Sequence, residues 1–222
     1  MTIYKQLSGK INHQVELIGT DSSKTMLLSA KNRCLSLNNH ELAIDFCTID
    51  ESTRFYNCDI ITSSLVLPYA PKPEQMLKEF FDRLRPGGLL VSSHWPHPSQ
   101  VPFLGVLKCV SYFMANRERK ELFELDSDIT FSLWDENKVR RLYEEQGLCI
   151  QNWTVVDLPM IFPNIRCLLS FCRIANWFQD SECYVEAEKE TLRILKDSFH
   201  LELQADTPFE LPSKVIVVSA SK

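Results

Sequence analysis

Acidic and hydroxyl side chains follow three apolar stretches in the first third of the chain. Asp21, Asp45 and Ser63 each lie at or near the end of a stretch whose composition is typical of a buried strand. In open α/β sheets, ligands bind outside the carboxyl ends of the strands, so we expect these side chains to line one cleft. A carboxylate placed there accepts hydrogen bonds from neighbouring hydroxyl groups, such as those of a ribose. The alternative for Asp21 is that it caps the helix predicted to follow it.

Two histidines are further candidates for chemistry. His94 and His97 flank Trp95 just beyond a predicted strand. A histidine in this place can orient or deprotonate a substrate group. The alternative is that both are ordinary polar loop residues, so the sequence names no catalytic residue.

The elements that must position these residues alternate between strand and helix. Strands are predicted at 14–20, 41–46, 59–67, 89–93, 148–157 and 214–219, and helices at 23–37, 76–84, 103–122, 134–146, 162–178 and 182–199. Gly147 is the expected C-cap of the helix before it, and residues 85–88 form a turn by composition. This alternation predicts an α/β fold with a doubly wound, mostly parallel sheet.

The size and composition are those of a globular protein. The chain has 222 residues, of which 45% are hydrophobic and 24% charged, which predicts a single domain over 1–222 with room for a modest lid. The formal net charge is −5 and no basic block stands out, so nucleic acid is not an expected partner. No stretch approaches the roughly 20 apolar residues that a membrane span needs.

Eight cysteines raise the question of a metal site or a disulfide framework. None of them forms a C-x-x-C pair, and no histidine lies at zinc-finger spacing. We therefore expect no metal, and free, mostly buried cysteines in a reducing compartment. The expected location is the cytoplasm.

Three segments carry motifs in a familiar order. Residues 16–33 contain an apolar run followed by Gly19, Asp21 and Met26. Residues 58–93 contain a β-branched strand, an amphipathic helix and a Leu-Arg-Pro-Gly-Gly turn, and residues 206–222 end in another apolar strand. In this order the segments resemble the class I S-adenosylmethionine-dependent methyltransferases of small molecules, closely over 15–93 and loosely elsewhere.

The resemblance implies a Rossmann-like sheet with an antiparallel last strand, and S-adenosyl-L-methionine as the cofactor. The cofactor-binding residues that it implies are Asp21, Ser22, Met26, Asp45, Phe46 and Ser63. Asp21 would accept hydrogen bonds from the ribose, while Asp45 and Phe46 would hold the adenine, with Asp50 as a rival acid. Ser63 or Ser64 would approach the methionine part of the cofactor.

The family's first strand and its glycine-rich loop have no counterpart here. Gly9 is the only glycine before Gly19. A strand at 2–7 would be separated from the next by residues 8–13 alone, whereas a parallel crossover needs about a dozen residues or more. Three explanations stay open: a truncated gene product or alternative start, a degenerate methyltransferase that binds a partner, or a strand supplied by another chain.

The leading hypothesis is methyl transfer to a small-molecule acceptor, with the segments 95–132 and 160–200 as lid helices on the substrate side. Catalysis in this class depends mainly on positioning. The alternative is a catalytically inactive domain that acts as a binding or regulatory partner. Apolar lid residues such as Phe103 and Leu104 fit a lipophilic or aromatic acceptor, and fit a packed core equally well.

Overall fold

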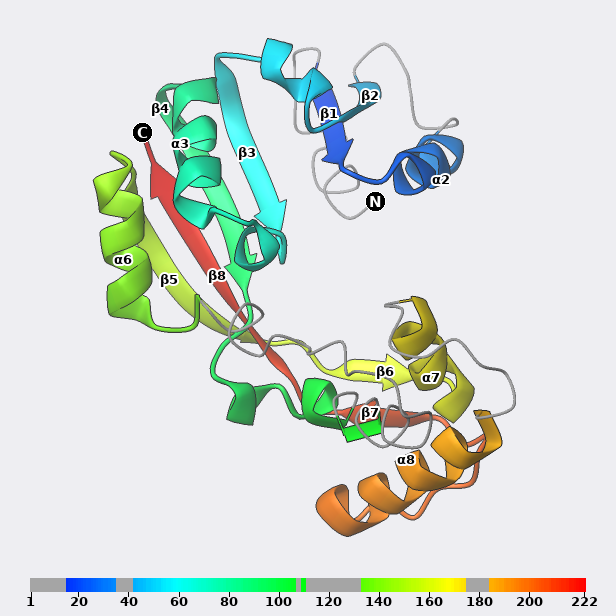
Figure 1. The fold of residues 1–222 in the computed structure, drawn as a ribbon. Coiled ribbons are helices and arrows are strands. Elements are labelled where there is room, and N and C mark those ends of the chain that lie inside the picture. The colour runs from blue at the N-terminus through cyan, green and yellow to red at the C-terminus, as the bar shows by residue number, and fades with distance from the viewer. Residues whose placement is uncertain (1–14, 35–41, 107–108, 111–132, 175–183) are drawn as a thin grey trace. The chain divides into compact units, whose positions relative to one another are not determined.

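The structure, a computed structural model, describes residues 15–34, 42–106, 109–110, 133–174 and 184–222 (Figure 1). The chain divides into two compact units, Met1–Tyr56 and Asn57–Lys222, and each unit has its own sheet. None of the helices in the described segments combines the length and the apolar character that crossing a bilayer requires.

The first unit is a strand–helix–strand motif. Strand β1 (Val15–Asp21) leads into helix α2 (Lys24–Cys34), after which strand β2 (Leu42–Thr48) pairs with β1 in parallel. The short 3-10 helix η1 (Glu51–Arg54) follows β2. The predicted order of strand, helix and strand is therefore confirmed, and the last predicted turn of the helix lies outside the described residues.

Gly19 is the residue that lets an aromatic ring pack on β1. In the parallel register Gly19 lies opposite Phe46, and a Cβ on Gly19 would come within 2.6 Å of the Phe46 ring. Real Cβ atoms do not approach other atoms so closely, so any larger residue at position 19 would displace the ring.

The second unit is built on a four-stranded sheet in the order β3-β4-β8-β5 (Figure 1). Its strands are β3 (Cys58–Ser64), β4 (Leu84–His94), β5 (Cys149–Asp157) and β8 (Lys214–Ser221). β3 and β4 are parallel, whereas β8 runs antiparallel to both of its neighbours. The expected α/β fold with an antiparallel last strand is confirmed.

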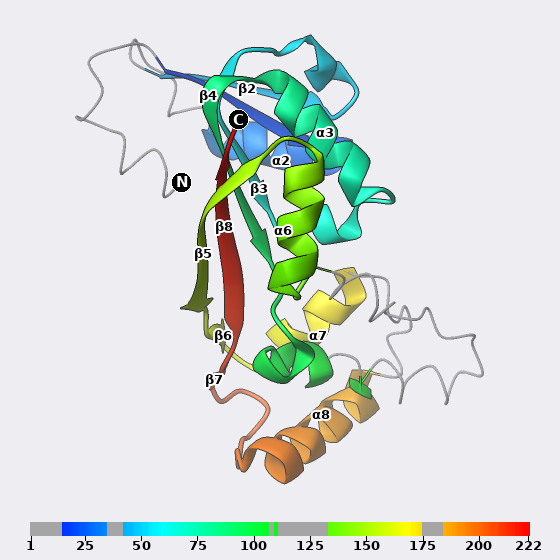
Figure 2. The same ribbon diagram turned by 90° about the vertical axis from the view of Figure 1, so that its left-hand side faces the viewer.

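Helices α3 (Pro73–Arg83) and α6 (Glu136–Glu145) cover one face of this sheet (Figure 2). Leu77 of α3 and Tyr143 of α6 are buried there in one cluster with Leu90 of β4. Alternate residues of a strand point to the same face, so Ser92 and His94 of β4 face these helices as well. Gly147 ends α6 in the left-handed conformation, with φ of 81°, as the predicted C-cap requires.

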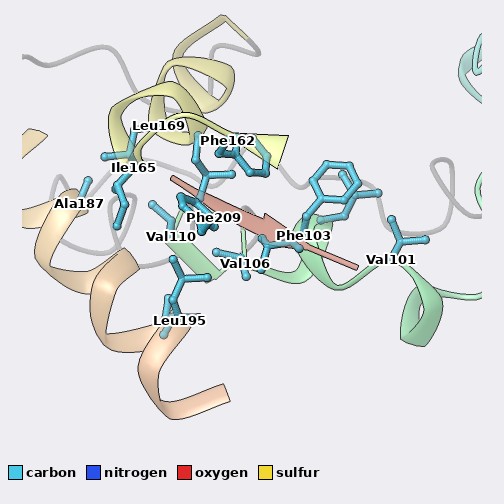
Figure 3. Close-up of a cluster of buried hydrophobic side chains, with 14 of the residues drawn as sticks. Val101, Phe103, Val106, Val110, Phe162, Ile165, Leu169, Ala187, Leu195 and Phe209 are labelled. Atoms are coloured by element: carbon cyan, nitrogen blue, oxygen red, sulfur yellow. The ribbon is translucent and has the colours of Figure 1, made fainter. Parts of the chain in front are cut away.

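The remaining described residues of 95–110 and 160–211 form what we call the distal module. It contains the two-stranded ribbon of β6 (Met160–Phe162) and β7 (Phe209–Leu211), the helices α7 (Ile165–Ile174) and α8 (Tyr184–Phe199), the 3-10 helix η3 (Pro98–Gln100), and helical residues at 102–106 and 109–110. Figure 3 shows its core, in which Phe103, Phe162 and Phe209 pack with Leu169 and Leu195. The strands β6 and β7 were not predicted.

Two predicted boundaries in the second unit are wrong. The strand predicted at 59–67 ends at Ser64, because Leu65 adopts a left-handed backbone with φ of 54° and leads into the 3-10 helix η2 (Leu67–Tyr69). The predicted turn at 85–88 is instead part of β4. It is an irregular stretch between the paired residues Leu84 and Leu89, with φ of 74° at Gly87.

No disulfide joins any two of the six cysteines whose side chains the structure describes, but the burial of these cysteines differs from the prediction. Cys47 is buried, whereas Cys109, Cys149 and Cys167 are exposed. The expectation of mostly buried thiols is therefore wrong. An apolar run around a cysteine does not fix which face of a strand or helix the thiol occupies.

Candidate functional site

Asp21 is the last residue of β1 and lies at the carboxyl end of the strand. Its Oδ1 accepts a hydrogen bond from the backbone N–H of Ser23 at 2.8 Å, and Ser23 Oγ accepts one from the N–H of Met26. The residue that caps α2 is therefore Ser23, and Asp21 accepts from the N–H of this cap and not from an N–H of the helix. Within the described residues Oδ2 of Asp21 makes no hydrogen bond, so the carboxylate retains capacity to accept from a ligand.

Two further predicted residues, Ser22 and Met26, follow Asp21 closely in the sequence. Ser22 is exposed between the strand and the helix, and the Met26 side chain is 59% exposed. A large apolar side chain left open at a strand end can pack on the flat face of a ligand ring. Both placements are compatible with the predicted roles, which stay predictions.

The register of β1 and β2 separates Asp45 from Phe46. Phe46 lies opposite Gly19, and since alternate residues share a face, its ring lies on the same face of the motif as Asp21. Asp45 lies opposite Ile18, three residues before the end of β2, and points to the other face. Its Oδ1 accepts a hydrogen bond from the N–H of Phe46 at 2.8 Å. The structure therefore brings Phe46, and not Asp45, to the face of Asp21.

Asp50 is the acid that the carboxyl end of β2 presents. The strand extends to Thr48, two residues beyond the predicted end, and Asp50 lies in the turn that follows. Thr48 and Glu51 fix this turn, because the N–H of each donates to the side chain of the other, at 2.8 and 3.3 Å. A correctly placed strand end would have favoured Asp50 over Asp45 from the sequence alone.

Ser63 belongs to the covered face of the second unit's sheet. It lies opposite Ser92 of β4, it is 5% exposed, and its Oγ has no hydrogen-bond partner in the described part of the chain. Ser64 lies opposite Ser93 on the other face, where it is exposed. The hydroxyl that solvent reaches at the end of β3 is therefore that of Ser64, the alternative considered above.

His94 lies in the core and not at the mouth of a cleft. Its Nε2 is 3.0 Å from Ser92 Oγ, its side chain is fully buried, and Nδ1 has no partner among the described residues. Burial lowers the pKa of His94 to about 4, and it raises the pKa of the neighbouring Tyr143. Neither a role on a substrate nor the alternative of a polar loop residue describes His94, since its ring is enclosed in the core at the end of β4.

His97 is the exposed member of the predicted histidine pair. Its Nδ1 lies 2.9 Å from Ser99 Oγ and accepts from the Ser99 N–H at 3.3 Å, and its ring meets the edge of Trp134. These contacts fix a polar loop, which is the simpler alternative. Across the described segments, no three His, Cys, Asp or Glu side chains gather in an arrangement that could hold a metal ion.

The candidate residues are distributed over the two units of the chain. Asp21, Met26 and Phe46 lie in the first unit and form one end of a parallel motif, whereas Ser63 lies in the second unit. The common cleft expected from the sequence therefore stays a prediction. Taken by itself, the first unit presents a carboxylate, an aromatic ring and an open methionine, which suits the nucleoside half of a ligand.

Comparison with known families gives one match, to the methyltransferase domain, over residues 2–90. Among curated proteins, the demethylmenaquinone methyltransferases of Staphylococcus saprophyticus and Staphylococcus haemolyticus are each 28% identical to this chain, over 149 and 148 residues. The match covers 64% of this chain in both cases, and 63% and 61% of those two proteins. The matched region thus spans less than two thirds of their length.

Solved structures share the fold. The YcgJ protein from Bacillus subtilis superposes with a TM-score of 0.59 at 16% identity, covering 100% of this chain and 96% of that protein. The [4+2]-cyclase SpnF superposes with a TM-score of 0.52 at 12% identity, covering 100% of this chain and 80% of that protein. At these identities the likeness concerns the fold alone.

Proposed function

We propose that the chain is a class I S-adenosylmethionine-dependent methyltransferase and that it transfers a methyl group to a small-molecule acceptor. The family's cofactor, S-adenosyl-L-methionine, supplies an electrophilic methyl group when bound. The observation that carries the proposal is the parallel motif of the first unit, in which Asp21 ends β1 inside the matched segment. Because transfer requires donor and acceptor to be aligned, the protein contributes mainly by positioning them.

The side chains of the first unit fit the nucleoside half of the cofactor. The Asp21 carboxylate keeps one oxygen for the ribose hydroxyls while the other oxygen accepts from the N–H of Ser23. The Phe46 ring and the Met26 side chain supply apolar surface for the adenine. The acid proposed to accept a hydrogen bond from the exocyclic amine of the adenine is Asp50 and not Asp45, because Asp50 follows the end of β2.

The methionine half of the cofactor has less support. The sequence has six glycines and none of them forms a Gly-x-Gly pattern, so the backbone loop that normally approaches this half has no counterpart. We assign the remaining contacts to the ends of β3 and β4, where Ser64 and Ser93 carry exposed or half-exposed hydroxyl groups. Ser63 serves this role only through a rearrangement, because its side chain is buried.

The test is calorimetric titration of the whole chain with S-adenosylhomocysteine, the demethylated cofactor. Asp21→Asn keeps an acceptor for the Ser23 N–H but removes the charge, so we expect about ten-fold weaker binding at an unchanged melting temperature. Ser23→Ala is the matched control, since it removes a capping bond and leaves the carboxylate in place. Equal losses in both variants would mean that Asp21 acts only through its contact with Ser23.

The acceptor is proposed at the level of a small molecule. Phe103 and Leu104 are 1% and 8% exposed within the distal core, so the apolar character of the proposed lid reflects packing and does not indicate a lipophilic acceptor. The two curated relatives are named for demethylmenaquinone. Demethylmenaquinone is therefore the first acceptor to assay, with transfer of a labelled methyl group as the readout.

An inactive, partner-binding domain is the second candidate. It is favoured by the lack of a Gly-x-Gly pattern in this sequence. The fold alone does not decide between the two, because the same fold occurs in a protein named as a cyclase. Absence of binding at millimolar S-adenosylhomocysteine would select this candidate.

A further inference from the structure

Leu65 has a backbone conformation that its residue type disfavours. It follows the last residue of β3 and has φ of 54°, in the left-handed region where a Cβ crowds the next carbonyl oxygen. Glycine or asparagine normally occupies such a position. A leucine persists there only when its surroundings favour this conformation over its relaxed alternatives.

Two sets of contacts hold Leu65, one through its backbone and one through its side chain. Its N–H donates to the carbonyl oxygen of Ser93 at 3.2 Å and to Ser93 Oγ at 3.0 Å. The Ser93 hydroxyl then donates to Ser64 Oγ at 3.3 Å. The half-buried Leu65 side chain packs against the core of the distal module. One residue thus joins the carboxyl ends of β3 and β4 to a core formed by later segments.

We infer that Leu65 is a positioning residue, whose side chain, packed on the distal core, holds the turn that ends β3. A shorter side chain would lose this packing while keeping the cost of the left-handed backbone, so the turn would relax. The hydroxyls of Ser64 and Ser93 would then lose their arrangement. The consequence for cofactor binding rests on the proposed function, whereas the coupling between turn and distal module does not.

The comparison of Leu65→Ala with Leu65→Gly tests the inference, because both remove the packing and only glycine removes the backbone cost. We expect the alanine variant to bind S-adenosylhomocysteine about five- to thirty-fold more weakly than the glycine variant, the range that corresponds to the left-handed penalty. We also expect the amide of residue 65 to exchange faster with solvent in the alanine variant. Equal affinity and equal exchange in the two variants would overturn the inference.

Hydrogen exchange keeps the test independent of the cofactor. If the wild-type chain does not bind S-adenosylhomocysteine, the proposed function fails. The inference is then tested by amide hydrogen exchange alone, measured at residue 65 and in helices α7 and α8. Both variants should speed exchange in these helices, since both remove the packing. The control is Asn57→Gly, which relieves a left-handed residue with φ of 57° just before β3, at the strand end opposite the turn.

Ser93→Ala provides a second approach that leaves the core intact, in case the Leu65 variants do not fold. It removes one of the two acceptors of the Leu65 N–H. We expect faster exchange both at residue 65 and in α7 and α8, because the turn and the distal module are coupled. Exchange that rises at residue 65 and stays unchanged in both helices would show that they are not coupled.

Discussion

The hydroxyl oxygen of Tyr143 lies 2.5 Å from Oγ of Ser92, so that helix α6 and strand β4 are joined by a polar contact inside an apolar core. The same Ser92 oxygen lies 3.0 Å from Nε2 of His94, and all three side chains are buried. Buried polar groups are costly unless they are paired. This network therefore ties the strand that ends at His94 to the helix that covers it.

Burial of His94 predicts that acid destabilises the protein. The folded-state pKa is about 4, below the ordinary value of 6.5, so the unfolded chain binds the proton more readily. The contribution of His94 to stability is complete above pH 6.5 and is lost as the pH falls from 6.5 towards 4. Over that window the loss is on the order of 3 kcal/mol.

His94→Gln checks this expectation, because a neutral amide can keep the contact with Ser92 and does not titrate. Tyr143, the other titratable group facing His94, stays neutral throughout the window because its pKa is raised. The measurement is urea unfolding of both proteins between pH 4 and 7. The slope of stability against pH should be smaller in the variant, and parallel curves would contradict the assignment.

Removal of the Tyr143 hydroxyl should destabilise the folded state. Tyr143→Phe leaves the ring packing unchanged but takes away a buried partner of Ser92, which we expect to cost about 1–2 kcal/mol of unfolding free energy. Tyr69→Phe is the matched control, since the Tyr69 side chain is 50% exposed. Equal stability of the two variants in urea would show that the buried contact contributes little.

Gly147 should not tolerate a side chain. With φ of 81° and a Cβ position 2.9 Å from the Phe81 ring, Gly147→Ala combines backbone strain with a clash between α6 and α3. We expect a loss of about 2–3 kcal/mol in thermal or urea unfolding. Gly105→Ala is the control, because a Cβ on Gly105 would meet no atom within 4 Å, and it should leave stability nearly unchanged.

The register of β1 and β2 predicts which acid contacts the adenine. Asp50→Asn should weaken the binding of S-adenosylhomocysteine by about ten-fold, since it removes a charged acceptor at the strand end. Asp45→Asn should change the affinity less than about two-fold, because Asp45 points to the other face. The opposite order in a calorimetric titration would restore the original assignment of Asp45.

Local signals predicted the order and type of most elements. Gly147 was expected to end a helix because a left-handed cap favours glycine, and the structure confirms it. The β-branched composition of 59–64 and 214–219 predicted strands, and both are present. The three-residue strands β6 and β7 were missed, because segments this short carry no periodicity that distinguishes them from loops.

Strand ends and faces were predicted less well. The end of β2 was predicted at Phe46, two residues too early, which made Asp45 the favoured acid. The end of β3 was predicted at residue 67, three residues too late, so the turn at Leu65 was missed. Since side chains alternate between the faces of a strand, such errors move a residue to the wrong side of the sheet. The same reason explains why Ser63 was favoured over Ser64.

The sequence by itself determined the alternation of strand and helix, because periodicity and turn chemistry are local properties of the chain, and its resemblance to a methyltransferase family implied the antiparallel last strand. Only the tertiary structure decided which polar side chains are enclosed. His94 and Ser63 are buried because α3 and α6 cover their face of the sheet, and Leu65 is held by residues that follow it by 28 positions or more. Burial is a property of packing between distant segments, so no window of sequence around these residues contains it.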